Sequence, residues 1–267
     1  MREILAVWRS PRQTVLVGVI AAAYAAVLIP FKLIPVIPGY TELRPANAVP
    51  VAMAILFGPA AAWRSAFGNL IGDLFGTLSL GSLFGFVGNF LYGLIPFQVW
   101  RLLSRGRTPS WVAGYGFLAA GTVLASAACG GVIGWGIETL GIGPPFVYLG
   151  NFIVINNAVM SLVLAPLLLV LLIRPMTELG LTYDRLRGES EPRGPGARHV
   201  LGSVLLVVGC VGVMVACNLV GWRVPVEKYK QILPYVSLPT VAPGSPQAMG
   251  GAGAPFILLI LIGCALL

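Results

Sequence analysis

Long apolar runs separated by short polar segments make up most of this chain. The runs show no alternation of period two, which argues against an outer-membrane barrel. Each of the longer ones has about the 20 apolar residues that a helix needs to cross a bilayer. We therefore expect an all-α integral membrane protein, with helices at about 13–36, 47–63, 66–80, 82–103, 111–137, 147–173 and 200–222, and an eighth beginning near 255. The two short runs between 47 and 80 could instead be partly re-entrant.

One segment interrupts this pattern. Residues 174–199 are strongly polar and contain Pro, Gly and charges of both signs, which is typical of a linker. The sequence thus predicts a six-helix transmembrane bundle over residues 1–173, a cytoplasmic linker over 174–199 and an additional C-terminal helix pair over 200–267. The last apolar run has only about 12 residues, too few to span a bilayer, so we expect an incomplete or re-entrant last helix.

Composition agrees with a membrane protein: hydrophobic residues make up 57%, charged residues 10%, and the mean hydropathy is +0.90. The net charge of +8 does not indicate nucleic-acid binding, because the basic residues lie between the apolar runs and form no single patch. Most of them fall on one side when the N-terminus is placed in the cytoplasm, as the positive-inside rule requires. We expect a multi-pass protein of the cell membrane with a cytoplasmic N-terminus.

The segment from Phe57 to Gly93 is rich in glycine and places Asp73 in an otherwise apolar helix. A carboxylate at such depth costs roughly 2.5–3.5 kcal/mol, so it normally faces a partner, a cavity or a ligand. Pairing with a neighbouring helix is the structural alternative. Asp73 is the first candidate for a binding site.

Other polar residues fall at the same, outer side of the predicted bundle. Convergent polar groups in an apolar wall, flanked by aromatic rings, are typical of a small-molecule pocket, although any single asparagine could simply bond to a neighbouring helix. The external loop 38–46 would cover this pocket as a lid. The predicted substrate-binding residues are Tyr40, Glu42, Arg44, Asn47, Asp73, Asn89, Trp135, Glu138, Asn151 and Asn156.

Small residues recur at four-residue spacing in the first helix, as Ala21 with Ala25 and Ala22 with Ala26. Such stripes allow close approach of helix backbones. They serve either packing within the bundle or docking of another membrane subunit, and the sequence does not distinguish the two.

Several kinds of chemistry have no motif here. The chain has no GxxxxGK[ST], HExxH or GxSxG segment, and its one histidine, His199, lies in the linker. The four cysteines fall within apolar runs without metal-ligand spacing. We expect no cofactor, no metal site and no enzymatic activity.

The external loop leading into RPANAVPVAMAILFGPAAA, the helix with GNLIGDLFG and the AxxxA spacing of the first helix resemble the substrate-binding S component of energy-coupling factor (ECF) transporters. The resemblance covers about residues 10–175. It implies a vitamin or similar micronutrient bound near the outer face, with transport driven by a separate coupling subunit and two ATPases. It also implies that Ala21, Ala22, Ala25 and Ala26 contact the coupling subunit. The helix pair after Arg174 is not part of a minimal S component.

The leading interpretation is therefore a membrane substrate-capture subunit of an ATP-driven importer. A proton-coupled secondary transporter using Asp73 and a non-transporting membrane scaffold are the alternatives.

Overall fold

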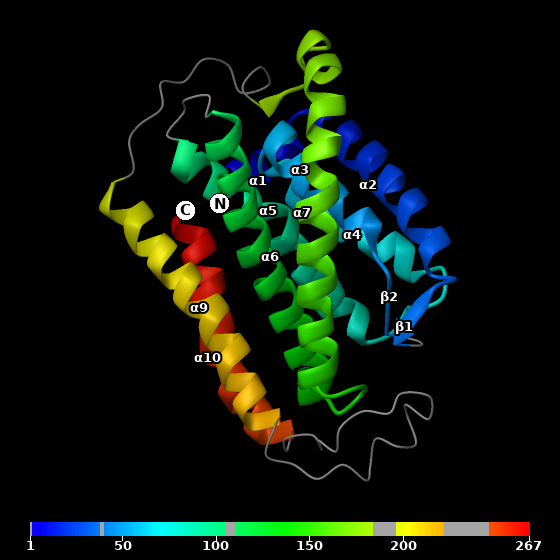
Figure 1. Cartoon of the computed structure of the whole chain (residues 1–267), viewed down its shortest axis with the longest axis vertical. Helices are drawn as coiled ribbons and strands as arrows, with labels where there is room; N and C mark the ends of the chain where they lie inside the picture. Colours follow the sequence, from blue (N-terminus) through cyan, green and yellow to red (C-terminus); the bar gives the residue numbers. More distant parts are fainter. Residues whose placement is uncertain (1, 38–39, 105–109, 184–195, 222–245) are drawn as a thin grey trace.

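The computed structural model describes residues 2–37, 40–104, 110–183, 196–221 and 246–267. They form a helical bundle with one small two-stranded sheet (Figure 1), which confirms the predicted all-α membrane class. Six helices of this part of the chain are long and apolar enough to cross a membrane: α2 (Pro11–Phe31), α5 (Gly81–Ser104), α6 (Trp111–Thr139), α7 (Phe146–Glu178), α9 (Ala197–Gly221) and α10 (Pro246–Leu266).

The segment between α2 and the next helix is a β-hairpin, not a continuation of the helix to residue 36. Strand β1 (Pro35–Ile37) pairs antiparallel with β2 (Thr41–Glu42). Pro35 explains the early end of α2, because a proline disfavours helical backbone at the residue before it. A short 3-10 turn, η2 (Pro45–Asn47), then leads into the bundle.

Two short helices follow, α3 (Ala48–Phe57) and α4 (Ala60–Asp73). The chain turns between them at Gly58, whose φ of 67° lies in the left-handed region that glycine adopts without strain. The predicted boundary, between residues 63 and 66, was therefore too late. Residues 74–80, expected to be helical, form turns instead, with Gly76 at a φ of 137°. Neither α3 nor α4 is long enough to span a bilayer by itself.

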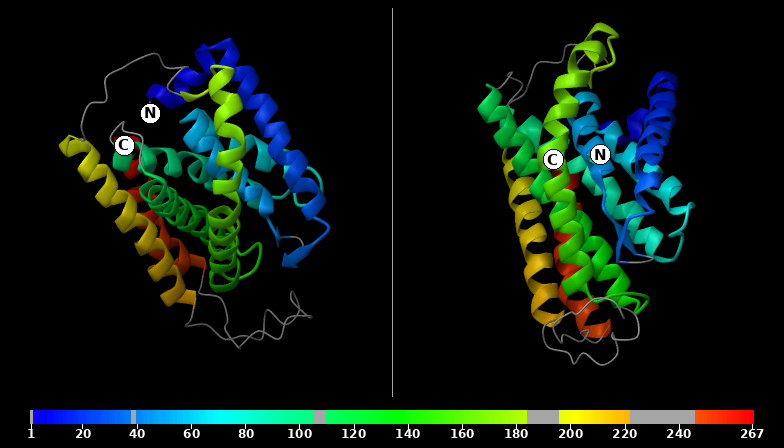
Figure 2. Two further views of the ribbon diagram at one scale, coloured as in Figure 1. Left: turned by 45° about the horizontal axis from the view of Figure 1, so that its top comes forward. Right: turned by 45° about the vertical axis from the view of Figure 1, so that its right-hand side comes forward.

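The helices pack in a row across the bundle. α2 packs against α4, α4 against α5, α5 against α6, and α6 against the pair α9 and α10, while α3 and α7 pack together across this row. In Figures 1 and 2 the C-terminal helix pair lies on one flank and α2 on the other. The additional pair thus leaves the outward face of α2 uncovered.

The last helix is longer than the sequence predicts. α10 has 21 residues because it begins at Pro246, within a segment rich in glycine and alanine that we expected to be loop. Small residues are needed there, since a Cβ at Gly253 would lie 2.2 Å from the Trp135 ring on α6. With this earlier start, α10 is long enough to cross a membrane, unlike the run of about 12 residues expected there. Most of the expected linker, residues 184–195, and of the expected external loop, residues 222–245, lies outside the described residues.

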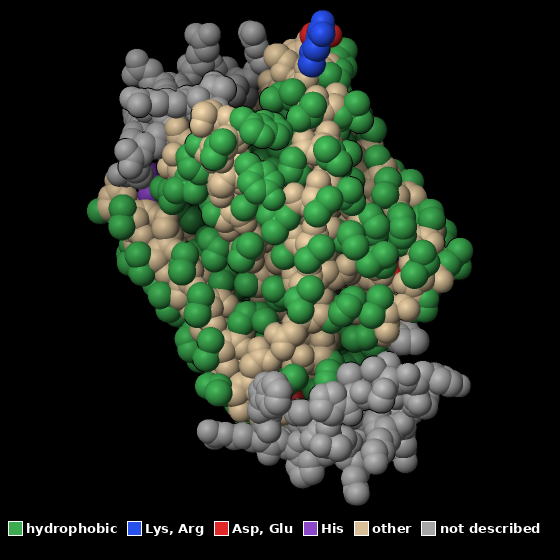
Figure 3. All heavy atoms as spheres, in the orientation of Figure 1, with side chains coloured by type: hydrophobic (Ala, Val, Ile, Leu, Met, Phe, Trp, Pro, Cys, Tyr) green, Lys and Arg blue, Asp and Glu red, His purple; other side chains and the backbone are tan. Residues whose placement is uncertain are grey.

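The bundle has two distinct ends. At one end, a short N-terminal helix, α1 (Arg2–Ala6), and a 3-10 turn, η1 (Val7–Arg9), precede α2, and Arg101 of α5 pairs with Glu3 at 2.9 Å. We call this the α1 end and the opposite one the β-hairpin end. Hydrophobic side chains cover most of the face between them in Figure 3. This apolar belt is the surface that a lipid bilayer would contact.

Candidate functional site

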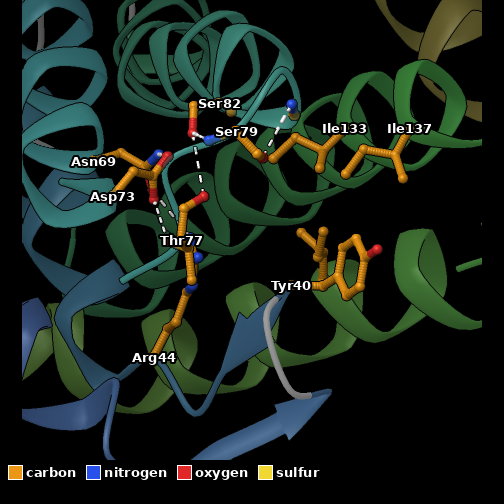
Figure 4. Close-up of a pocket in the computed structure, with 12 residues that line it drawn as sticks. Tyr40, Arg44, Asn69, Asp73, Thr77, Ser79, Ser82, Ile133 and Ile137 are labelled. Atoms are coloured by element: carbon orange, nitrogen blue, oxygen red, sulfur yellow. Dashed lines mark hydrogen bonds between the residues drawn. The ribbon is translucent and has the colours of Figure 1, made fainter. Parts of the chain in front are cut away.

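A small cavity lies at the β-hairpin end. It encloses about 40 Å³, room for roughly three water molecules if each needs 10–15 Å³ of such space. In Figure 4 polar side chains from α4 and the turn after it gather on one side, and isoleucines of α6 line another. The lining residues are Tyr40, Arg44, Asn69, Asp73, Thr77, Ser79, Gly81, Ser82, Gly85, Ile133, Ile137 and Ile153.

Five polar side chains form a closed circuit beside this cavity, which we call the charged ring: Lys32, Glu42, Arg44, Asn69 and Asp73. Lys32 Nζ lies 3.7 Å from Asp73 Oδ1 and 3.9 Å from Glu42 Oε1. Arg44 Nε lies 3.0 Å from Glu42 Oε1. Asn69 closes the circuit, since it accepts from Arg44 Nη1 at 3.1 Å and donates to Asp73 Oδ2 at 3.2 Å. The ring joins the end of α2, the β-hairpin segment and the end of α4.

Helix geometry explains why α4 supplies two members of the ring. Asn69 and Asp73 are four residues apart, so they lie on one face of the helix. Thr77 continues this spacing beyond the helix end and donates to Asp73 Oδ1 at 3.0 Å. Gly85 of α5 faces these groups, and a Cβ there would lie 3.2 Å from Asn69 Nδ2. Its lack of a side chain keeps the space beside Asn69 open.

The ring carries balanced charge, with two carboxylates and two cations. Burial of the Arg44 guanidinium works against its charged form, but the negative groups around it, Glu42 first, outweigh that effect and raise its pKa above the ordinary value. Arg44 is therefore a permanent cation on the cavity wall.

Some hydrogen-bonding capacity in this region is unused. Arg44 Nε and Glu42 Oε1 form an ion pair, yet neither has a hydrogen-bond partner of good geometry within the described part of the chain, and the same holds for the buried Thr41 Oγ1. Buried polar atoms are normally matched, by protein, water or ligand. This side of the bundle is thus equipped to accept an additional polar group.

A layer of asparagines supports the ring from behind. Asn156 of α7 donates to the backbone oxygen of Glu42 at 2.9 Å and so fixes strand β2. Asn47 accepts from the Tyr24 hydroxyl at 2.9 Å and donates to Asn157. These contacts are satisfied within the protein, so Asn47 and Asn156 position the β-hairpin segment and do not line the cavity.

Four other predicted site residues do not line the cavity either. Asn151 exchanges two hydrogen bonds with Asn218 of α9, and Trp135 Nε1 donates to Gly250 of α10 at 3.4 Å. Glu138 accepts from the first backbone N–H of α7, and Asn89 donates to a carbonyl in its own helix. The structure thus brings together Tyr40, Glu42, Arg44 and Asp73, and places the other predicted residues in contacts away from the cavity.

Sequence reasoning missed three residues of this region. Lys32, Asn69 and Thr77 were not among the predicted site residues. The spacing 69, 73 and 77 was a usable signal for the latter two, since it follows one helical face. The position of Lys32 could not be foreseen, because it depends on how the end of α2 meets α4.

The alanine stripe of α2 divides into two faces. Ala21 and Ala25 are 1% and 2% exposed and pack toward α4, where a Cβ at Gly68 would lie 2.9 Å from the Ala21 oxygen. Ala22 and Ala26 are exposed, and a Cβ built on the nearby Gly18 meets nothing within 4 Å. Half of the stripe is internal packing, and the other half is a flat outward face.

No group of three or more His, Cys, Asp or Glu in the described residues could hold a metal ion. The cavity instead combines hydrogen-bonding groups with an apolar wall, inside a bundle of membrane-spanning length. These features define a polytopic membrane protein with a candidate small-molecule site at one end.

The sequence comparisons identify the family. The family model for the QueT transporter matches residues 14–174, and the chain belongs to this family. It is a substrate-binding S component of the ECF type, as the resemblance implied. Neither a curated protein nor a solved structure matches the chain. The match ends within α7, so the C-terminal helix pair lies outside it.

Proposed function

We propose that this chain captures a queuosine precursor at the cavity of the β-hairpin end and delivers it through a coupling subunit driven by ATPases. The observation that carries the proposal is the charged ring, with its unused hydrogen-bonding capacity, beside a cavity with an apolar wall. Family membership supports the substrate, since QueT transporters serve uptake of queuosine precursors. Binding and release need no covalent chemistry.

The chemistry of the lining suits a deazaguanine base. Such a base offers ring N–H and amino donors and a carbonyl acceptor along one edge. Asp73 and Asn69 can accept from its donors, and the Arg44 guanidinium can donate to its carbonyl. The flat faces of the base would contact Tyr40 and the isoleucines of α6. These are hydrogen bonds and apolar contacts of the kind that set specificity in small sites.

The cavity must widen to admit such a base, because about 40 Å³ holds only a few water molecules. Tyr40 joins the β-hairpin to the turn after α6 through a 2.9 Å hydrogen bond to the Ile142 oxygen. Release of this bond would let the hairpin move away from α6. The hairpin therefore acts as the lid of the site.

The distribution of basic residues supports a cytoplasmic N-terminus. Four arginines lie toward the α1 end, Arg9, Arg12, Arg101 and Arg174, whereas the described part of the β-hairpin end has two basic residues, Lys32 and Arg44. By the positive-inside rule the α1 end, with the C-terminal end of α7 and the N-terminal end of α9, then faces the cytoplasm, and the β-hairpin end faces outward. In this orientation the cavity lies at the outer end of the bundle, from which an importer receives its substrate.

The outward face of α2 is the proposed docking site for the coupling subunit. Ala22→Trp should abolish uptake in cells that contain the ATPase module while binding of substrate stays within about twofold, because bulk prevents a close helix crossing. Ala21→Trp is the matched control. It should destabilise the protein, since Ala21 is already packed against α4. Equal loss of binding in both variants would show that the whole stripe serves internal packing.

Binding of 7-cyano-7-deazaguanine to the purified protein, measured by calorimetry, tests the site itself. Ile137→Phe should fill the cavity and weaken binding at least tenfold, because Ile137 lines it. Val123→Phe, on a 50% exposed position of the same helix, should bind normally. Normal binding by Ile137→Phe would contradict the site. Uptake by this chain alone, driven by a pH gradient in liposomes, would instead indicate a secondary transporter.

A further inference from the structure

Lys32 lies next to the cavity without lining it. Its ammonium donates to Thr77 Oγ1 at 2.6 Å and lies 3.7 Å from Asp73 Oδ1, and both of these partners line the cavity. The Lys32 side chain is only 7% exposed. The lysine therefore contacts Asp73 from the end of α2, while the same carboxylate lines the cavity.

This placement makes Lys32 a resident counter-ion. A buried carboxylate beside a cavity would otherwise attract a cationic group of a ligand. Here Asp73 and Glu42 already share two cations, Lys32 and Arg44. A neutral ligand leaves this balance intact, whereas a ligand cation adds an unmatched positive charge in surroundings of low dielectric constant.

We propose that Lys32 is a specificity-determining residue that makes the site prefer an uncharged ligand substituent over a cationic one of similar size. The inference rests on the proposed function, since it concerns the same cavity and a deazaguanine ligand. The inference specifies the charge of the preferred ligand substituent. It assigns the selection to Lys32, a residue that does not line the cavity.

Two probes of nearly equal shape test this selection. 7-Cyano-7-deazaguanine carries a neutral nitrile, and 7-aminomethyl-7-deazaguanine carries an ammonium at the same position. Calorimetry on the full-length protein gives the ratio of their dissociation constants. The wild type should bind the nitrile more tightly. Lys32→Gln should shift the ratio toward the ammonium by on the order of a hundredfold, as expected for removal of one charge about 6 Å away at an effective dielectric constant near 20.

Two control variants separate charge from structure. Lys32→Arg keeps the cation and should keep the wild-type ratio. Arg174→Gln removes a positive charge whose side chain is 86% exposed, on α7 at the last residue of the family match, so it should leave the ratio unchanged. A merely structural role of Lys32 would weaken both probes equally in Lys32→Gln and would not change their ratio.

A compensating variant protects the test against loss of stability. Lys32→Gln combined with Glu42→Gln removes one charge of each sign, so the ring is neutral again, and the ratio should return to within about threefold of the wild type. An unchanged ratio in Lys32→Gln, or a wild type that prefers the ammonium probe, would overturn the inference while leaving the substrate class in place. Failure of the wild type to bind either probe would overturn both.

Discussion

The charged ring and the Asn151–Asn218 pair are both polar contacts inside an apolar bundle, yet they differ in how completely they are satisfied. Each asparagine of the pair bonds to the other, at 2.7 and 3.1 Å, and to a carbonyl of its own helix. The ring, by contrast, contains atoms without hydrogen-bond partners and borders a cavity. The ring thus keeps hydrogen-bonding capacity beside a cavity, whereas the capacity of the asparagine pair is spent on joining α7 to α9.

The largest expected effect follows from Asp73→Asn. This change replaces the charged carboxylate that lines the cavity with a neutral amide, which turns one of its two acceptor oxygens into a donor, and should weaken binding of 7-cyano-7-deazaguanine at least tenfold. It should also lower stability by up to about 3 kcal/mol, because Lys32 then keeps a single carboxylate partner, Glu42 at 3.9 Å. Calorimetry and thermal unfolding in detergent measure the two effects.

A double variant separates these two roles of Asp73. Lys32→Met combined with Asp73→Asn removes both charges and should recover most of the stability but not the binding. Normal binding by Asp73→Asn alone would show that the carboxylate is structural and does not belong to the site.

A smaller effect is expected for Asn156→Leu. Asn156 does not line the cavity, but it holds strand β2 through the Glu42 backbone. Its loss should weaken binding about three- to tenfold by loosening the β-hairpin, with little change in the affinity ratio of the two probes. If binding is unaffected, the position of the hairpin does not depend on this hydrogen bond.

The smallest effect on binding is expected at Asn151, five residues earlier on the same helix. Asn151→Leu should cost about 1 kcal/mol of stability, because Asn218 loses its partner, and binding should stay within twofold. Asn151→Leu with Asn218→Leu should be more stable than either single variant, since no unmatched amide remains. Thermal unfolding of the four proteins gives this coupling directly, and a clear loss of affinity would place Asn151 in the site.

The sequence pointed to several residues of the candidate site, but not to all residues that line the cavity or form the charged ring. Depth in an apolar helix identified Asp73, and the external loop identified Tyr40, Glu42 and Arg44. The same reasoning also selected Trp135 and Asn151, whose partners Gly250 and Asn218 lie on the C-terminal helix pair. A polar side chain at the right depth looks alike whether it faces a cavity or another helix, because hydropathy reports depth and not direction.

The sequence by itself determined that this chain is a helical membrane bundle, since length and hydropathy of the apolar runs admit no other fold in a bilayer. It also determined the polar layer and the small residues of α2, because both follow from residue type and spacing. Only the tertiary structure decided which alanines face α4, where α10 begins, and that Lys32 meets Asp73 beside the cavity. Those outcomes depend on the rotation of each helix about its axis and on contacts between distant segments, which packing fixes.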